Sequence, residues 1–268
     1  MAHGNEPLKR TVSPPLYNQF LLPEIQRERF DVVLVRPRNP LNIGAAARAM
    51  ANFGFSHLSV VAPFAPTWRE ARSAVDCQDV LVSAVESATL GESVAGATLV
   101  LGTGSLQFRK PEQRVVRLPE LPELVNRELA RGGRVALVFG PEKHGLTRDD
   151  LSWCHVLVEI PTDPRQPSMN LGQAVAVCLY ELAVRIDSTE VMSGPEPVES
   201  NRLELLAGMV EEAMEAADYR PRALQPTNRH DLRLLLRRLS LSAHDTRRIL
   251  GIFRRILWRL KHGVGAER

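Results

Sequence analysis

The sequence has little cysteine and no long apolar run. Its three cysteines, at positions 77, 154 and 178, are widely spaced and form no C-x-x-C pair, so nothing points to a disulfide framework or a zinc site. The longest uncharged stretches, residues 93–108 and 170–180, are short or rich in glycine, and the amino terminus lacks the apolar segment of a signal peptide. We therefore expect a cytoplasmic protein without a metal or a membrane partner.

What is present is typical of a globular protein. Hydrophobic residues make up 44% and charged residues 24% of the 268 positions, which excludes general disorder. The net charge of +3 is unevenly distributed, because the segment from Arg220 to the end holds thirteen Lys/Arg and three Asp/Glu. That segment alone carries +10 and the remainder −7. The basic tail therefore predicts a polyanionic partner.

Short apolar runs alternate with helical patterns through most of the chain. The apolar runs, rich in β-branched residues, occupy residues 31–35, 58–61, 98–102, 135–139 and 156–160. The helical patterns occupy residues 45–53, 77–87, 121–131, 147–154 and 171–185. Because the apolar runs lack polar alternation, we expect strands of a parallel sheet that is covered on both faces, as in the α/β class.

Changes in composition suggest four segments. Residues 1–28 are polar and rich in proline, and are predicted to be a flexible extension of an α/β domain at 29–188. Residues 189–222 are predicted to be a linker that includes a helix, and 223–268 a small basic helical domain. Leucines 232, 235, 236 and 239 form one apolar stripe there, and a second runs from Ile249 to Leu260. We expect the arginines, Arg237 and Arg254 among them, on the opposite faces.

The loops that leave the predicted strands are the places to look for a ligand site, because open parallel sheets bind ligands at the carboxyl ends of their strands. Four of these loops are rich in Gly, Asn or Ser. Each alone has a plain structural explanation: Asn42 as a helix cap with Arg48 as a surface charge, residues 102–105 as a turn, and Ser168 or Asn170 as a cap. Their location at one edge of the sheet predicts a shared site.

The loop after residue 139 has the spacing of a phosphate loop but not its chemistry. Gly140 and Gly145 have the right separation, yet Leu146 stands where the phosphate-binding lysine is needed. This disfavours an NTPase. His144 has no identifiable acidic partner to orient it, so we interpret it as an exposed residue and not as a catalytic one.

Three segments resemble, in order and spacing, the motifs of the SpoU/TrmH family of SPOUT RNA ribose methyltransferases. They are NIGAAARA (42–49), VFGPEKHGL (138–146) and IPTDPRQPSMNLGQAVAV (160–177). The resemblance covers about residues 30 to 190, and the basic helical tail is most similar to the TrmJ branch, whose members act on the anticodon loop of tRNA. It implies a parallel sheet with a C-terminal trefoil knot, a homodimer, and S-adenosylmethionine as the cofactor.

The resemblance also implies site residues. The catalytic set would be Arg48, Asn42, Glu142, Ser168 and Asn170. The cofactor would be held by Thr103, Gly104, Ser105, Gly140, Ile160, Ser168, Met169 and Asn170. Because a guanidinium is almost never neutral, we expect Arg48 to fix the ribose and a phosphate and to favour the alkoxide electrostatically, instead of acting as a base.

The function implied is methylation of a ribose 2′-hydroxyl in tRNA, at nucleotide 32 of the anticodon loop. The branch is expected to carry an arginine where this sequence has Leu106, with Arg109 and Lys110 only later, which leaves the target nucleotide open. Two alternatives remain, a methyltransferase of ribosomal RNA and a non-catalytic RNA-binding module. The intact motif residues argue against the module. For the tail alone, a membrane-surface or partner helix is the alternative.

Overall fold

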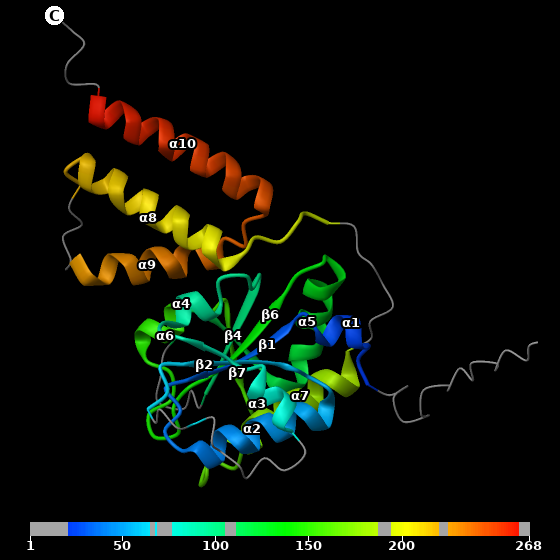
Figure 1. The fold of residues 1–268 in the computed structure, drawn as a ribbon. Coiled ribbons are helices and arrows are strands. Elements are labelled where there is room, and N and C mark those ends of the chain that lie inside the picture. The colour runs from blue at the N-terminus through cyan, green and yellow to red at the C-terminus, as the bar shows by residue number, and fades with distance from the viewer. Residues whose placement is uncertain are drawn as a thin grey trace, which may run out of the picture.

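The computed structural model describes residues 21–64, 68, 77–104, 111–186, 194–219 and 225–262, with the side chains of 225–228 left out. Two parts are visible, a sheet flanked by helices and a group of three helices that packs on one side of it (Figure 1). The apolar runs of the sequence form the central strands, and the basic tail contributes two of the three grouped helices.

Seven parallel strands form the sheet in the order β3-β2-β1-β6-β4-β7-β5. Their bounds are β1 (Phe30–Val35), β2 (His57–Val61), β3 (Val85–Ser87), β4 (Leu99–Thr103), β5 (Arg114–Arg117), β6 (Val135–Phe139) and β7 (Val156–Glu159). From β1 the chain proceeds outward to β2 and β3, whereas β4 to β7 lie on the other side of β1. The order therefore reverses between β1 and β6, and such a switch point leaves a crevice at the carboxyl ends of the strands.

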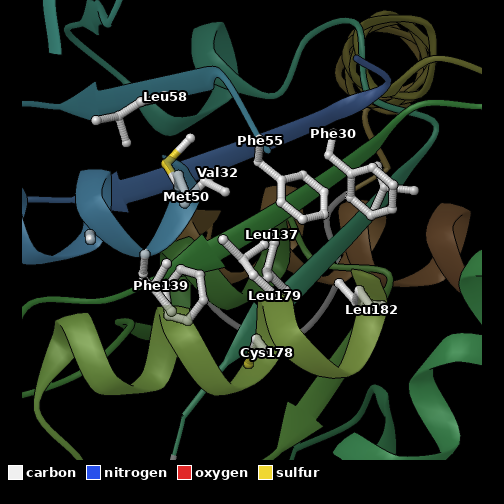
Figure 2. Close-up of a cluster of buried hydrophobic side chains, with 14 of the residues drawn as sticks. Phe30, Val32, Met50, Phe55, Leu58, Leu137, Phe139, Cys178, Leu179 and Leu182 are labelled. Carbon is white, nitrogen blue, oxygen red and sulfur yellow. The ribbon is translucent and has the colours of Figure 1, made fainter. Parts of the chain in front are cut away.

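The helices of the α/β domain cover both faces of this sheet (Figure 1). They are α1 (Glu24–Arg27), α2 (Pro40–Phe53), α3 (Gln78–Val82), α4 (Leu90–Ser93), α5 (Leu121–Ala130), α6 (Arg148–Ser152) and α7 (Leu171–Arg185). Small residues let α2 and α7 approach closely, since a Cβ built at Gly172 would lie 2.6 Å from the Cβ of Ala45. Figure 2 shows the core beneath them, where Met50 of α2 and Leu179 of α7 lie near Phe139 of β6.

The helical domain consists of α8 (Ser200–Ala216), α9 (Gln225–Arg238) and α10 (Ala243–His262). Its core joins residues of all three helices, namely Leu203, Leu206, Ala207, Leu236 and Leu250. The prediction assigned residues 189–222 to a linker that includes a helix. That helix, α8, shares its core with α9 and α10. Buried Leu203 and Leu206 give α8 an apolar face that a linker helix would expose.

The structured part of the chain begins before residue 29. Leu22 is 2% exposed and its backbone N–H donates to the carbonyl of Ala183 at 2.7 Å, which joins this segment to the end of α7. The predicted flexible extension of residues 1–28 therefore needs correction at its carboxyl end. Residues 1–20 lie outside the described part of the chain.

Some predicted boundaries also differ from the structure. The helix expected at 77–87 ends at Val82, and the chain continues into the edge strand β3. Helix α2 begins at Pro40, earlier than the expected residue 45, and its cap is Asn39, whose side chain accepts from the N–H of Leu41. Asn42 is thus free of the capping role that the plain explanation gave it.

Candidate active site

A cleft of about 260 Å³ opens at the carboxyl ends of β4, β6 and β7, next to the switch point. It lies at the edge of the sheet where the sequence predicted a ligand. The residues that line it are Thr103, Gly104, Phe139, Gly140, Pro141, Glu142, Lys143, His144, Gly145, Leu146, Ile160, Thr162, Pro167, Ser168, Met169, Leu171 and Ala174. The cleft therefore joins the loops that follow three different strands.

Gly140 is required by a close approach of the backbone. A Cβ at this position would lie 2.3 Å from the backbone nitrogen of Leu146 and 2.4 Å from the carbonyl carbon of Gly145. Gly145 itself has φ of +63°, a conformation that glycine adopts without strain. The loop between β6 and α6 consequently folds back on itself, so that the backbone at Gly140 lies against the backbone of Gly145 and Leu146.

Asn42, Glu142 and Asn170 form a hydrogen-bonded chain across three loops. The side-chain amide of Asn42 donates to Oε1 of Glu142 at 2.8 Å, and the amide of Asn170 donates to Oδ1 of Asn42 at 3.0 Å. Oδ1 of Asn170 in turn accepts from the backbone N–H of Gly172 at 2.9 Å, which makes it the cap of α7. The three side chains fix the loops after β1, β6 and β7 relative to one another.

Glu142 also binds the backbone of the loop after β1. Its carboxylate accepts from the N–H groups of Arg38 at 3.3 Å and Asn39 at 3.4 Å. Burial alone would raise the pKa of Glu142, but the hydrogen bonds from Asn42 and from these backbone groups outweigh it and lower the pKa. Glu142 is therefore an ionised acceptor at neutral pH and not a proton donor.

A second link between the same loops was not predicted from the sequence. Arg36, at the end of β1, donates to Asp150 of α6 at 3.2 Å and makes a second, short contact with the same carboxylate. Asp150 is buried and also caps α6 by accepting from the N–H of Thr147 at 2.7 Å. The positive φ of Arg36, +47°, is a signal that only the folded backbone reveals.

Arg48 is separate from the cleft of its own chain. It is exposed on α2, makes no hydrogen bond or ion pair with the residues that the structure describes, and does not line the cleft. Leu41, on the same face of α2, is 60% exposed, and Tyr180 of the neighbouring α7 is 53% exposed. Arg48 thus lies on an exposed face that α2 and α7 form together.

The structure places the predicted site residues that it describes in three positions. Thr103, Gly104, Gly140, Glu142, Ile160, Ser168 and Met169 line the cleft. Asn42 and Asn170 lie behind it and hold Glu142, while Arg48 lies apart. Ser105, together with Leu106, Arg109 and Lys110, lies outside the described residues. His144 lines the cleft and is exposed there, as expected of its position in the loop.

The basic residues of α9 are engaged in contacts inside the protein. Arg229 pairs with Glu204 and Glu211 of α8, each at 2.8 Å, and Arg233 pairs with Glu204 at 2.9 Å. Arg237, predicted to face solvent, is 3% exposed and donates to the carbonyl of Trp153 at 2.9 Å. The prediction was wrong for this residue, because Arg237 is buried where α9 packs against the end of α6.

Several basic residues of α10 have no ion-pair partner among the described residues, although Arg247 pairs with Glu196 and Lys261 with Glu212. Arg248, Arg254 and Arg259 are exposed and make no ion pair within the described part of the chain. The guanidinium of Arg255 lies 4.6 Å from the centre of the Trp258 ring, which is itself 47% exposed. Helix α10 therefore presents more unpaired positive charge to solvent than α9, whose exposed Arg238 lies 3.7 Å from Glu112.

The described residues contain no group of three or more His, Cys, Asp or Glu that could hold a metal ion. None of the helices in the described ranges combines the length and the apolar character needed to cross a bilayer.

A parallel sheet with a loop-built cleft beside its switch point is typical of α/β proteins that bind ligands at the carboxyl ends of their strands. The chain belongs to the SpoU rRNA Methylase family, whose model matches residues 29–180. It is 34% identical over 244 residues to the tRNA (cytidine/uridine/adenosine-2′-O-)-methyltransferase TrmJ of Pseudomonas aeruginosa. This match covers 86% of this chain and 93% of that protein. It is 31% identical over 238 residues to the tRNA (cytidine/uridine-2′-O-)-methyltransferase TrmJ of Cronobacter sakazakii, covering 84% and 93% of the two chains.

A solved structure agrees with these relatives. The crystal structure of TrmJ from Z. mobilis ZM4 superimposes with a TM-score of 0.73 and 31% identity, and the match covers 84% of this chain and 98% of that one. The similarity thus covers more of the chain than the residues of the family model, 29–180.

Proposed function

We propose that this protein is an S-adenosylmethionine-dependent methyltransferase that modifies a ribose 2′-hydroxyl of tRNA. The observation that carries the proposal is the cleft at the switch point, framed by the chain of Asn42, Glu142 and Asn170, in a member of the SpoU family. Relatives that match 84% to 86% of this chain are named tRNA 2′-O-methyltransferases, which supports tRNA as the substrate.

The residues of the cleft fit this cofactor. Ile160, Leu171 and Phe139 give it an apolar wall that suits an adenine ring, and the close turn at Gly140 presents backbone donors and acceptors for the polar parts. Bound there, the cofactor supplies a methyl group activated by its sulfonium. The residues of the cleft that would hold it are Thr103, Gly104, Gly140, Ile160, Ser168 and Met169.

The remaining site residues act on the ribose by positioning. Asn170 and Asn42 keep the Glu142 carboxylate in place, and Glu142 ties down the backbone that leads into α2. Arg48 holds the ribose and its phosphate and stabilises the negative charge that develops on the 2′-oxygen. As the methyl group bonds to the 2′-oxygen, the hydroxyl proton passes to solvent water, because the arginine is already protonated and cannot accept it.

We also propose that two chains form a homodimer through the exposed face of α2 and α7. Leu41, Tyr180, Val177 and Val184 expose apolar surface on this face, which is more than a solvated helix pair needs. Arg48 lies on the same face and away from its own cleft. A dimer built on this face would bring the Arg48 of one chain to the cofactor of the other.

The RNA-binding surface that we propose is the exposed side of α10. Arg248, Arg254 and Arg259 offer unpaired charge for phosphates. By resemblance to the TrmJ branch, the target is nucleotide 32 of the anticodon loop. With tRNA as the substrate, we place the activity in the cytoplasm.

We further propose that the segment from β6 to α7 forms the trefoil knot of the SPOUT fold. It is supported by the sheet order, in which β4 lies between β6 and β7, so that the chain crosses β4 before α7 returns to α2. Single-molecule stretching from the two termini tests this: a knot that tightens leaves a shorter extended length than an unknotted chain of 268 residues.

The name of the family favours a second candidate, a ribosomal RNA substrate. The purified protein should be incubated with methyl-deuterated S-adenosylmethionine and with tRNA or ribosomal RNA, followed by mass spectrometry of mapped fragments. We expect labelled 2′-O-methylnucleotides in tRNA, at nucleotide 32, and their loss in Arg48→Ala but not in Arg127→Ala. Label only in ribosomal RNA would favour the second candidate. Cofactor and RNA binding without transfer would favour a binding module.

A further inference from the structure

A second cavity, of about 540 Å³, lies between the two domains. On the side of the sheet it is bounded by Thr98, just before β4, and by residues 131–134, just before β6. On the side of the helices it is bounded by residues 196–202 and by the first turns of α10. It therefore lies at the amino ends of the strands, at the opposite edge of the sheet from the proposed active site.

Four arginines from three different segments line this interdomain cavity. They are Arg131, Arg134, Arg202 and Arg247, and the acidic lining residues are Glu196 and Glu199. Four guanidinium groups against two carboxylates leave the lining with two positive charges in excess. Like charges gathered from both domains oppose docking of the domains unless an anion lies between them.

These arginines have few ion-pair partners. Arg131 interacts electrostatically with Glu128 but forms no ion pair within the described part of the chain. Arg247 lies 3.9 Å from Glu196, and both side chains are more than 70% exposed, so solvent screens the pair. Arg134 lies 3.4 Å from Asp31, outside the cavity lining. Arg202 makes no ion pair with any residue that the structure describes. The guanidinium groups thus keep donors for a ligand.

The floor of the cavity adds two features of a built site. Val198 and Leu250 are buried and give it a rigid apolar base that belongs to the core of the helical domain. Thr246, which is 1% exposed and lines the same cavity, has a hydroxyl without a hydrogen-bond partner. A buried polar group of this kind is uncommon in a protein interior and is relieved when a ligand or water accepts or donates a bond.

We propose that the interdomain cavity binds a phosphate group, held by Arg131 and Arg202 from the two domains. Arginine suits this ligand because its planar fork forms two parallel hydrogen bonds with phosphate oxygens. The phosphate can come from the RNA backbone, in which case the inference rests on the proposed function, or from a free phosphate compound. Either ligand would tie the helical domain to the α/β domain at a point remote from the active site.

The test compares Arg131→Gln/Arg202→Gln with Arg127→Gln/Arg185→Gln, which removes two exposed arginines outside the cavity. Binding of tRNA is measured over a salt series, and binding of inorganic phosphate and pyrophosphate by calorimetry. If RNA supplies the phosphate, the cavity variant binds tRNA at least about tenfold more weakly, and the control does not. Its salt slope is also shallower, by about 1 for each phosphate that the variant no longer neutralises.

If a free phosphate compound supplies the group bound in the cavity, the cavity variant loses calorimetric binding of phosphate or pyrophosphate. Its affinity for tRNA then equals that of the wild type. Thr246→Val, which keeps the shape of the side chain, should weaken binding of the same phosphate compound. Equal affinity of all variants for tRNA, phosphate and pyrophosphate would overturn the proposal. Methyl transfer by the wild-type chain reports on the proposed function independently.

Discussion

The side-chain amide of Asn42 donates to the carboxylate of Glu142 at 2.8 Å, and the two residues are 100 positions apart in the sequence. Parallel pairing of β1 with β6 produces this contact, because it brings the loops at the ends of both strands together. Asn42 is also the acceptor for Asn170, so it is the central member of the chain. The active-site loops therefore depend on one amide that both donates and accepts.

Asn42→Ala should reduce methyl transfer by about 10- to 100-fold in kcat, because the loops lose a positioning bond on which alignment of the reacting groups depends. Thermal stability should change little, since the residue is only partly buried. Steady-state kinetics and a melting curve check both statements. Asn126→Ala, on α5 away from the cleft, is the matched control and should retain wild-type turnover. Full activity of Asn42→Ala would remove the network from the mechanism.

Stability below neutral pH should depend on His155. Its Nδ1 accepts from the N–H of Val100 at 3.0 Å, and burial, followed by repulsion from Arg237, lowers the pKa of His155 to about 3. The unfolded chain binds a proton near the ordinary pKa of 6.5, which the folded chain does not. Neutral His155 therefore favours the folded state fully above pH 6.5. As pH falls from 6.5 toward 3, the free energy of unfolding decreases by up to about 1.4 kcal/mol per pH unit.

Denaturant unfolding at a series of pH values tests this dependence. His155→Asn keeps an acceptor near the position of Nδ1. Below pH 6.5, its free energy of unfolding should fall less steeply with decreasing pH than that of the wild type, by the slope that one bound proton produces. His57→Asn, at a partly exposed histidine of β2, is the control and should keep the wild-type slope. The same slope in His155→Asn would show that other groups carry the acid dependence.

The sequence predicts the centre of this sheet better than its edges. Strands β1, β2, β4, β6 and β7 are apolar because both faces are covered, and their positions agree with the predictions to within one residue at each end. The edge strands β3 and β5 are short and carry polar residues such as Glu86 and Arg117, so they give no apolar run to detect. An uninterrupted apolar run in the sequence therefore identifies only those strands whose two faces are both covered.

The site was predictable where motif residues line it and not where tertiary contacts decide. Motif spacing indicated Gly140, Glu142 and Asn170, and these lie at or beside the cleft. The pairing of Arg36 with Asp150 and the burial of Arg237 depend on how distant elements pack. A charged residue on an amphipathic helix is expected to face solvent. Arg237 is buried instead, because α9 packs against α6.

Removal of Arg237 should loosen the helical domain. Its guanidinium donates to the carbonyl of Trp153 and to the hydroxyl of Ser200 at 2.9 Å each, and lies 5.3 Å from the centre of the Trp153 ring. Arg237→Ala leaves these buried acceptors without a donor and should lower the free energy of unfolding by about 2 to 4 kcal/mol. Arg254→Ala, at an exposed arginine of α10, should change it by less than about 0.5 kcal/mol. Chemical denaturation of both variants measures the difference, and equal effects would contradict the docking role.

Tyr180→Arg should convert the proposed dimer to monomers, because a charge would be buried in an apolar contact without a partner. Tyr219→Arg makes the same change at a tyrosine of similar exposure, 61% against 53%, outside the proposed interface. Sedimentation velocity reports the oligomeric state. We also expect Tyr180→Arg to lose methyl transfer, since Arg48 would no longer reach the second chain. An active monomer would exclude a site shared between chains.

The exposed arginines of α10 should supply the affinity for tRNA. Replacement of Arg248, Arg254 and Arg259 by glutamine removes three exposed charges that form no ion pair within the described part of the chain, so folding should be unaffected. Each phosphate left without its arginine should make the dependence of log affinity on log salt shallower by about 1, and the affinity itself should fall at least about tenfold. The matched control replaces Arg114, Arg117 and Arg127, which are also exposed but belong to the α/β domain.

Filter binding of tRNA across a salt series, with vesicles of anionic lipid as a second ligand, separates the explanations for this helix. RNA docking requires that the α10 variant lose tRNA binding while the control retains it. Loss of vesicle binding with unchanged tRNA binding would identify a membrane-surface helix. If neither ligand responds, the exposed Ile252 and Ile256, 58% and 41% accessible on the same helix, become the better account, because apolar residues at that spacing suit a contact with another protein helix.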